Sequence, residues 1–325
     1  MYQKITTLTI IALIGLLVAA CGGQQEVKDV TLMLDWTPNT NHTGLYVAQS
    51  EGYFEEAGLN VSIIEPGENF VESAVAAGAA NFGISFQEVA TFAMAEDAPI
   101  VSVAAIIQHN TSGFAARSEQ NVNSAADLAG KRYGAFGSPI EQPILNLLME
   151  CAGESVDTVE FIDIGWADFL SVTEADEVDF AWIFYGWSGI GAEQSGVELD
   201  IVMLKDHTDC VPDYYTPILI TSQEQIEADP DMVKAFVGAV AKGYEYAIDN
   251  PDSAADILLA AAPELDENLV KASQAWLANE YQADASQWGI QDRAIWQNFG
   301  DFLIASEVLE GPFDADAAFT NEFLD

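Results

Sequence analysis

The sequence predicts an α/β protein built from two lobes, which the chain connects twice, with a ligand cleft between them. Three observations lead to this fold class. The chain has 325 residues, longer than one ordinary domain and sufficient for two lobes of roughly 100 to 200 residues each. From Val30 onward, short apolar strand patterns alternate with helical periods. A mostly helical stretch follows Gln223 and must dock on one of the lobes.

The first α/β segment begins at Val30 and extends to about residue 112. Apolar runs predict its strands, and apolar residues recurring every three or four positions predict its helices, the first of which Gly58 closes. The expected strands are 30–36, 60–64, 82–85 and 100–107, and the expected helices are 44–59, 70–80 and 87–97. Strands and helices that alternate at this spacing indicate parallel βαβ units.

The second α/β segment shows the same alternation of strand and helix patterns. Its expected strands are 113–117, 131–136, 159–164, 179–184 and 199–205, and its helices start near Ser124, start after Ser138 and cover 166–175. The strand 212–222 and helices at 231–249, 252–261, 266–280 and 292–305 complete the chain. The expected lobes are therefore 30–112 plus 215–325, and 113–214. Two crossings make a hinge and place strand ends of both lobes at a shared cleft. A two-domain protein with a single crossing is the alternative.

The N-terminus has the layout of a bacterial lipoprotein signal. Lys4 precedes an apolar run, and VAAC at residues 18–21 leads into two glycines. The run is too short for a spanning helix with flanking anchors. We therefore expect a signal peptide at 1–20, a lipidated Cys21 and a tether at 21–29, on an exported protein that contacts the membrane through its lipid only. A small N-terminal membrane anchor with an incidental cysteine is the alternative.

The charge balance excludes two classes of partner. Ten Lys and Arg against 52 Asp and Glu give a formal net charge of −42. Such a surface repels nucleic acid and bare anionic membrane. Half of the residues are hydrophobic and only 19% are charged, so the chain is not a disordered acidic segment. An acidic surface poor in lysine indicates a protein from a salt-rich medium, where screening reduces self-repulsion.

Cysteine and histidine usage gives little support for a metal or a cofactor. Beside Cys21, only Cys151 and Cys210 remain, and the sequence leaves open whether they form a disulfide or two buried free thiols. The chain has three histidines, without the close spacing of a transition-metal site. We expect no metal and no cofactor.

Several motifs, in order along nearly the whole mature chain, carry a family resemblance. They are WTPNTNHTGLYVAQSEGYFEEAGLNV, VAAGAANFGIS, AEDAPIVSVAAI, DLAGKRYGAFGSPIEQ, WIFYGWSGIGA and DYYTPILITS. The chain resembles the substrate-binding proteins of ABC importers for thiamine-pyrimidine precursors, in a larger group shared with sulfonate binders and fungal pyrimidine synthases. The resemblance implies a type II periplasmic-binding-protein fold, an ABC permease as partner and no cofactor. We expect the protein to be a monomer.

The first motif supplies four candidate ligand-binding residues. Trp36 at a strand end offers a flat face, while Asn39, Asn41 and His42 offer donors and acceptors to the edge of a ring. The alternative is a structural role for these polar residues. Thr43 could cap the following helix, and Asn39 could hold a turn after Pro38.

Two further strand-to-helix junctions face the expected cleft. Ser85 and Phe86 follow the strand 82–85, although Phe86 could equally belong to the core. Ser138 precedes a helix with Pro139 expected at its first position, and free N–H groups there can hold an anion or a carbonyl oxygen. The alternative is an ordinary serine cap.

The aromatic stretch WIFYGW, residues 182–187, predicts the second half of a stacking site. Tyr185 or Trp187, placed across the cleft from Trp36, would sandwich a planar ring, and each contact stabilises by up to about 1.5 kcal/mol beyond burial. The resemblance implies acidic residues directly after GW and three positions later, where this chain has Ser188 and Gly191.

Glu193 is the candidate to replace the missing carboxylates. Tyr214 and Tyr215 lie at the predicted second crossing, where one could close over the ligand while the other packs in the hinge.

The shortage of arginine narrows the ligand class. Only Arg117, Arg132 and Arg293 exist, and none lies in the aromatic motifs, so a phosphorylated ligand or free amino acid is disfavoured. We expect a neutral planar heterocycle, a thiamine pyrimidine precursor, bound by stacking and lobe closure. Riboflavin and a sulfonate or nitrate are the other candidate ligands.

An enzyme resembling the fungal pyrimidine synthases is the alternative of another class. It is disfavoured because the resemblance implies a cofactor-binding lysine and a histidine where this chain has Ser85 and Val89. A cysteine-rich metal motif of those enzymes is missing from the sequence as well.

Overall fold

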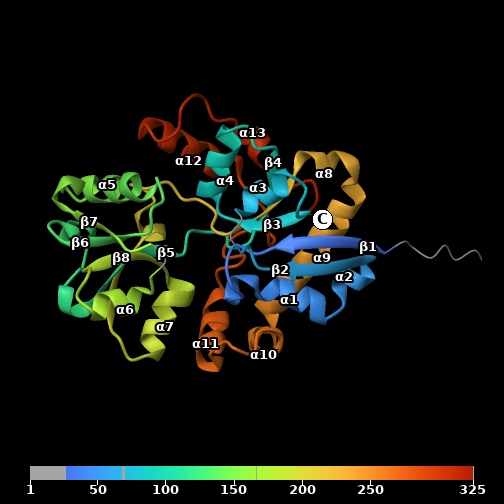
Figure 1. Cartoon of the computed structure of the whole chain (residues 1–325), viewed down its shortest axis with the longest axis horizontal. Coiled ribbons are helices and arrows are strands. Elements are labelled where there is room, and N and C mark those ends of the chain that lie inside the picture. The colour runs from blue at the N-terminus through green and yellow to red at the C-terminus, as the bar shows by residue number, and fades with distance from the viewer. Residues whose placement is uncertain (1–26, 68–69, 166, 325) are drawn as a thin grey trace, which may run out of the picture.

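The computed structural model describes residues 27–67, 70–165 and 167–324, so the predicted signal peptide and the lipidation site Cys21 lie outside the described residues. Two five-stranded sheets form the centres of two lobes, shown on the right and the left of Figure 1. Among the helices in these ranges, none is long and apolar enough to span a membrane.

Lobe 1 is built on a sheet with the strand order β2-β1-β3-β10-β4. Its strands are β1 (Lys28–Met33), β2 (Leu59–Ile64), β3 (Phe82–Ser85), β4 (Ile100–Ala105) and β10 (Ile218–Ser222). The first three pair in parallel, as the alternating pattern predicts, but β10 runs antiparallel to β3 and β4. The reason is connectivity: β4 runs toward lobe 2, whereas β10 returns from it.

The helices of lobe 1 come from both ends of the chain. They are α1 (Thr43–Ser50), α2 (Tyr53–Glu56), α3 (Val71–Ala76), α4 (Gln87–Ala95), α8 (Gln223–Ala228), α9 (Pro230–Asp249), α10 (Pro251–Ala261), α11 (Glu267–Leu277), α12 (Arg293–Ala305) and α13 (Ala315–Ala318). The single helix expected at 44–59 is two, because Gly52 takes a left-handed backbone (φ 77°) between them.

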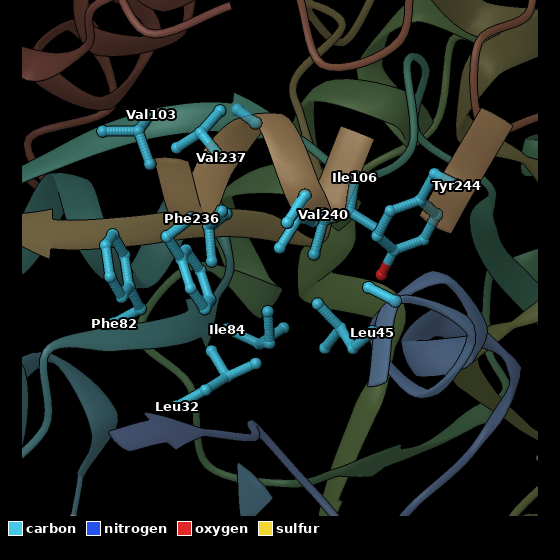
Figure 2. Packing of buried hydrophobic residues seen from close by; sticks show 14 of the residues in the cluster. Leu32, Leu45, Phe82, Ile84, Val103, Ile106, Phe236, Val237, Val240 and Tyr244 are labelled. Atoms are coloured by element: carbon cyan, nitrogen blue, oxygen red, sulfur yellow. The ribbon is translucent and has the colours of Figure 1, made fainter. Parts of the chain in front are cut away.

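The main core of lobe 1 lies between the sheet and α9. Phe82 of β3 stacks on Phe236 of α9 with ring centroids 3.8 Å apart, and Phe54 also stacks on Phe236, at 5.4 Å. Figure 2 shows Val237 and Val240 of the same helix in this layer, with Phe82, Ile84 and Leu32 of the sheet below them and Val103 beside Val237. A long C-terminal helix therefore completes the core that the N-terminal strands begin.

Lobe 2 has the strand order β7-β6-β8-β5-β9. Its strands are β5 (Ser112–Arg117), β6 (Arg132–Ala135), β7 (Glu160–Asp163), β8 (Phe180–Phe184) and β9 (Leu199–Met203), and its helices are α5 (Glu141–Cys151), α6 (Phe169–Glu174) and α7 (Ile190–Gln194). Strand β5 runs antiparallel to β8 and β9, because it leaves the lobe junction while they approach it. The helix expected near Ser124 is a 3₁₀ turn at Ala125–Leu128.

Helix α12 packs on both lobes, which the assignment of 215–325 to one lobe does not anticipate. Its Trp296 belongs to an apolar cluster of lobe 1, whereas Phe299 and Leu303 belong to the main cluster of lobe 2. Tyr214, on the second crossing, contacts Phe299 with ring centroids 4.5 Å apart. The chain passes between the sheets from β4 to β5 and from β9 to β10, and α12 lies against the second of these crossings.

A disulfide joins Cys151, at the end of α5, to Cys210, in the segment that leads to the second crossing. Of the two possibilities that the sequence left open, buried free thiols are therefore wrong. Cys151 is exposed, whereas Cys210 is partly buried and packs against the main apolar cluster of lobe 2. The bridge closes a loop of 59 residues that contains β8 and the WIFYGW stretch.

Candidate functional site

Aromatic rings from the two lobes meet where the sheets face each other. Phe86, directly after β3, stacks on Phe184, the last residue of β8, with centroids 5.9 Å apart and planes 19° from parallel. The next residue, Tyr185, meets Trp276 of α11 edge to face at 4.9 Å. We call Phe86, Phe184, Tyr185 and Trp276 the interlobe aromatic cluster. All four are partly buried, so their rings retain accessible surface.

Polar groups surround the Tyr185 and Trp276 end of this cluster. The Tyr185 hydroxyl donates to the Glu193 carboxylate at 2.6 Å. Burial, and then this carboxylate, raise the pKa of Tyr185 to about 12. Lys205 places its ammonium 5.2 Å from the Trp276 ring centroid and forms a 2.9 Å ion pair with Glu280. Glu193 is thus an exposed residue whose carboxylate already has a tyrosine partner.

Two residues of the WTPNTNH stretch are committed to local structure. Asn39 caps a 3₁₀ turn at Thr40–His42 by accepting a hydrogen bond from the Asn41 backbone N–H at 2.9 Å. The buried His42 ring accepts from the Asn39 N–H and contacts the Asp35 carboxylate at 2.5 Å. Both side chains therefore hold the turn. Trp36 is 48% exposed and Asn41 is partly buried.

The backbone of this stretch is tied to lobe 1 helices from the end of the chain. The Asn41 carbonyl accepts from the Tyr244 hydroxyl of α9 at 2.6 Å, and the Thr40 carbonyl accepts from the Tyr281 hydroxyl at 2.5 Å. The Thr40 hydroxyl also lies 2.5 Å from Ser273 Oγ of α11, and Ser273 in turn donates to the Gly186 carbonyl of lobe 2. Turn, helix and aromatic stretch are thus one connected unit across the lobes.

The loop before α5 does not present open N–H groups. Helix α5 begins at Glu141 and not at Pro139, and its first carboxylate folds back on the loop. It accepts from the backbone N–H groups of Phe136 (3.0 Å), Gly137 (2.8 Å) and Ser138 (2.6 Å). The donors that could hold an external anion are therefore bound to the chain's own carboxylate. The spacing Ser138 to Glu141 is a capping-box pattern, a signal that the sequence did contain.

Trp187 and Ser188 lie at a groove and not beside the Trp276 ring that Tyr185 contacts. They line a groove of about 400 Å³ together with residues of α6, α7 and α11. Trp187 also packs against the apolar cluster of Leu258 and Val270 on lobe 1. The structure therefore separates Tyr185, whose ring faces Trp276, from Trp187, whose ring packs beside this groove.

The remaining predicted residues lie deeper. Ser85 is buried and donates through its hydroxyl to the Glu72 carboxylate. Tyr215 is fully buried in lobe 1, and its hydroxyl accepts from the Asp292 backbone N–H at 2.7 Å. Tyr214 is buried too, in the core of lobe 2, so both tyrosines of the second crossing are interior residues.

Sequence reasoning missed Trp276, Phe184 and Glu88. Trp276 lies in a stretch where apolar residues recur at helical spacing, which predicts a core position. Phe184 has the sequence context of a strand end. Glu88 is a buried carboxyl in the first turn of α4, and in the sequence it cannot be distinguished from an ordinary acidic residue near a helix N-terminus.

Comparisons with known proteins agree with this architecture. The model of the family described as NMT1/THI5 like matches residues 39–254. The chain belongs to this family. It is 32% identical to the formylaminopyrimidine-binding protein of Halalkalibacterium halodurans over 305 residues, which cover 91% of each chain. It is 25% identical to the 4-amino-5-hydroxymethyl-2-methylpyrimidine phosphate synthase of Legionella pneumophila, over 91% of this chain and 92% of that protein.

The fold comparison confirms the predicted fold class. The solved structure of the alkanesulfonate-binding protein SsuA from Xanthomonas axonopodis pv. citri superposes with a TM-score of 0.69 at 16% identity, covering 91% of this chain and 99% of that chain. This NMT1/THI5-like chain therefore has the two-lobed periplasmic-binding-protein fold.

Proposed function

We propose that this protein is the extracytoplasmic substrate-binding component of an ABC importer and that it captures a thiamine pyrimidine precursor. The observation that carries the proposal is the interlobe aromatic cluster, because flat rings contributed by both lobes suit a planar heterocycle that stabilises the closed state. The similarity to a formylaminopyrimidine-binding protein over 91% of both chains supports the same ligand class. An ABC permease is the expected partner of the closed form.

The structure disfavours one of the alternative ligands. A sulfonate held at the Ser138 loop would have to displace the Glu141 carboxylate from three N–H groups. Two anions at one set of donors repel each other, so this loop supports a neutral ligand better. Riboflavin remains the alternative that the same aromatic rings would suit.

We propose a binding protein and not an enzyme. The synthase alternative rests on relatives at 24% to 25% identity, below the 32% of the formylaminopyrimidine-binding protein. At the positions where the resemblance implies a lysine and a histidine, this chain has a buried Ser85 bonded to Glu72, and Val89. Incubating the protein with the candidate pyrimidines and recovering them for mass spectrometry would test this point, and chemical conversion of a pyrimidine would contradict it.

The first experiment is titration calorimetry of the mature protein, with Cys21 replaced by serine, against formylaminopyrimidine, hydroxymethylpyrimidine, riboflavin and taurine. We expect tight binding of a pyrimidine and weak or no binding of taurine. Tight binding of riboflavin or taurine alone would keep the fold and the role in uptake but overturn the pyrimidine assignment.

Tyr185→Ala should weaken pyrimidine binding by about 10-fold to 100-fold, since stacking of a base on an aromatic ring contributes about 1–3 kcal/mol. Phe161→Ala, which removes a 38% exposed ring on β7, is the matched control and should leave the affinity unchanged. Trp187→Ala tests the competing location. A larger loss from Trp187→Ala than from Tyr185→Ala would place the ligand in the groove beside α7.

We further propose that the protein is lipid-anchored through Cys21 and adapted to salt. With a formal net charge of −42, self-repulsion should lower the thermal midpoint in dilute buffer. We expect the midpoint to rise by at least about 10 °C between ~0.05 M and ~2 M NaCl, because the Debye length falls from more than about 10 Å to less than about 3 Å. Equal thermal midpoints in both buffers would contradict the proposed adaptation to salt.

A further inference from the structure

One side of α11 carries a contact of lobe 1 with the aromatic stretch of lobe 2. Ser273 donates through its hydroxyl to the Gly186 carbonyl. Trp276 meets the Tyr185 ring edge to face at 4.9 Å. The helix passes so close to this stretch that a Cβ on Gly186 would lie 3.0 Å from the Leu277 side chain. Positions 273, 276 and 277 share one side of a helix, so these contacts come from a single surface of α11.

An ion pair lies just beyond the end of this surface. The Lys205 ammonium is 2.9 Å from each carboxylate oxygen of Glu280 and 5.2 Å from the centroid of the Trp276 ring. The two charged side chains are 28% and 17% exposed, so salt screens their attraction less than it screens a fully exposed pair. The ammonium therefore contacts both the carboxylate and the same indole that meets Tyr185.

Each partner of this ion pair is anchored in a different lobe. Lys205 lies in the 3₁₀ turn Leu204–His207, whose Leu204 belongs to the main cluster of lobe 2. Further along the same segment, the disulfide joins Cys210 to α5. Glu280 immediately precedes Tyr281, which is fully buried in the main core of lobe 1. The ion pair therefore connects two bodies that have separate cores.

The ion pair lies near the hinge. The Glu280 carbonyl accepts a hydrogen bond from the backbone N–H of Gln108, on the first crossing, at 3.3 Å. A donor and an acceptor that move apart by about 1 Å from hydrogen-bonding distance no longer form a hydrogen bond. A rotation of the lobes about the crossings therefore breaks the contact of Lys205 with Glu280, although both residues lie close to the crossings.

The charge balance gives this lysine a particular role. With ten Lys and Arg against 52 Asp and Glu, closure brings two acidic bodies together, and their like charges repel. Lys28 and Lys271 pair with carboxylates of lobe 1, and Arg132 pairs with carboxylates of lobe 2. These cations stabilise the lobe to which they belong. The Lys205 ammonium instead attracts a carboxylate of the other lobe.

We propose that Lys205 and Glu280 form an interlobe latch, which forms when the lobes close and sets how long the protein holds its ligand. The latch offsets the repulsion between the acidic lobes and positions the Trp276 ring against Tyr185. Because both partners belong to the protein, the pair also shifts the unliganded protein toward the closed form. This inference rests on the proposed function only in that the lobes close around a ligand, whatever the identity of that ligand.

Lys205→Met should release formylaminopyrimidine about 10-fold faster than the unmodified protein in dilute buffer, because methionine keeps an apolar stem but loses the ion pair and the contact of the ammonium with the indole. Losses of this kind appear mainly in the dissociation rate, which stopped-flow fluorescence measures. Lys271→Met is the matched control. It also removes one positive charge, but the partners of Lys271, Asp256 and Glu267, lie in lobe 1. It should release the ligand as the unmodified protein does, and equal rates for the two variants would contradict the latch.

A double-mutant cycle tests the pairing itself. Glu280→Gln should also speed release, since the ammonium loses its charged partner. If the two residues act as a pair, the double variant Lys205→Met/Glu280→Gln should lose no more than the larger of the two single losses. Losses that add would show that the residues act independently and would overturn the pairing. Thermal unfolding of each variant verifies that it is folded at the temperature of the measurement.

The shape of the unliganded protein supplies a readout that a lysine contacting only the ligand would not change. Small-angle X-ray scattering at about 0.05 M NaCl should give a larger radius of gyration for Lys205→Met than for Lys271→Met, because screening is weak at this ionic strength. At about 2 M NaCl the difference should shrink, because the Debye length falls below about 3 Å and the repulsion between the lobes is screened. Equal radii of gyration of the two variants in dilute buffer would overturn the latch.

The same measurements separate the two proposals. If the unmodified protein binds no formylaminopyrimidine, the proposed ligand is wrong, and the scattering comparison still tests the latch. If the unmodified protein binds it, but Lys205→Met and Lys271→Met agree in release rate and in radius of gyration, the proposed function stands and only the latch is wrong.

Discussion

Replacing both Cys151 and Cys210 with serine lowers the free energy of unfolding by about 4 kcal/mol, the expected result of opening a loop of 59 residues in the unfolded chain. Most of the expected loss arises in the unfolded state, because Cys151 is exposed and serine at the partly buried Cys210 has nearly the volume of cysteine. Urea denaturation of the unmodified and double-serine proteins measures the effect.

The single variant Cys151→Ser and the reduced unmodified protein are the controls for this prediction. Both lack the bridge, so both should lose about as much stability as the double variant. Since the loop contains β8 and Tyr185, we also expect reduction to weaken ligand binding at temperatures near the midpoint. A double variant as stable as the oxidised protein would show that the bridge does not stabilise the fold.

Gly243→Ala should destabilise the protein by about 2–3 kcal/mol and weaken ligand binding at least about 10-fold. A Cβ at Gly243 would lie 2.0 Å from the carbonyl oxygen of Gly44, so α1 and α9 would have to move apart. Helix α1 follows the turn of Asn39 and His42, and Tyr244 holds the Asn41 carbonyl, so this movement would displace the stretch that carries Trp36.

Gly238→Ala is the matched control for this prediction. It lies in the same helix, and a Cβ there meets nothing within 4 Å. Because alanine favours helix over glycine, we expect this variant to be unchanged or more stable by up to about 1 kcal/mol. Thermal unfolding and calorimetry of both variants test the pair. Equal behaviour of Gly243→Ala and Gly238→Ala would show that the close approach of the helices does not matter.

Much of the architecture follows from the sequence. Periodicity gives the strands and most helices, because the pattern of apolar residues records which faces are buried. The order of elements indicates two α/β segments and a return of the chain at 212–222, where β10 is found. The resemblance identifies the group to which the family match and the fold comparison also point. These features depend on local pattern and order, which a single sequence contains.

The site is less predictable, because several residues of suitable chemistry have partners elsewhere in the chain. His42 has the donors and acceptors of a ligand-binding residue, yet its ring is buried between Asp35 and the Asn39 backbone. The loop at Ser138 has the backbone of an anion site, yet Glu141 already supplies the anion. The sequence shows which groups could bind a ligand. It does not show which of them already have hydrogen-bond or ion-pair partners within the folded chain.

By itself, the sequence determined the two-lobed α/β class, the acidic surface, the aromatic stretch around Tyr185 and the family group. Only the tertiary structure decided that Trp276 faces Tyr185, that Cys151 joins Cys210 and that Glu88 is a buried carboxyl with one oxygen lacking a hydrogen-bond partner. The physical reason is that secondary structure and composition depend on neighbours along the chain, whereas stacking, pairing and desolvation depend on neighbours in space. Residues far apart in sequence meet at the junction of the lobes, and their chemistry is set there.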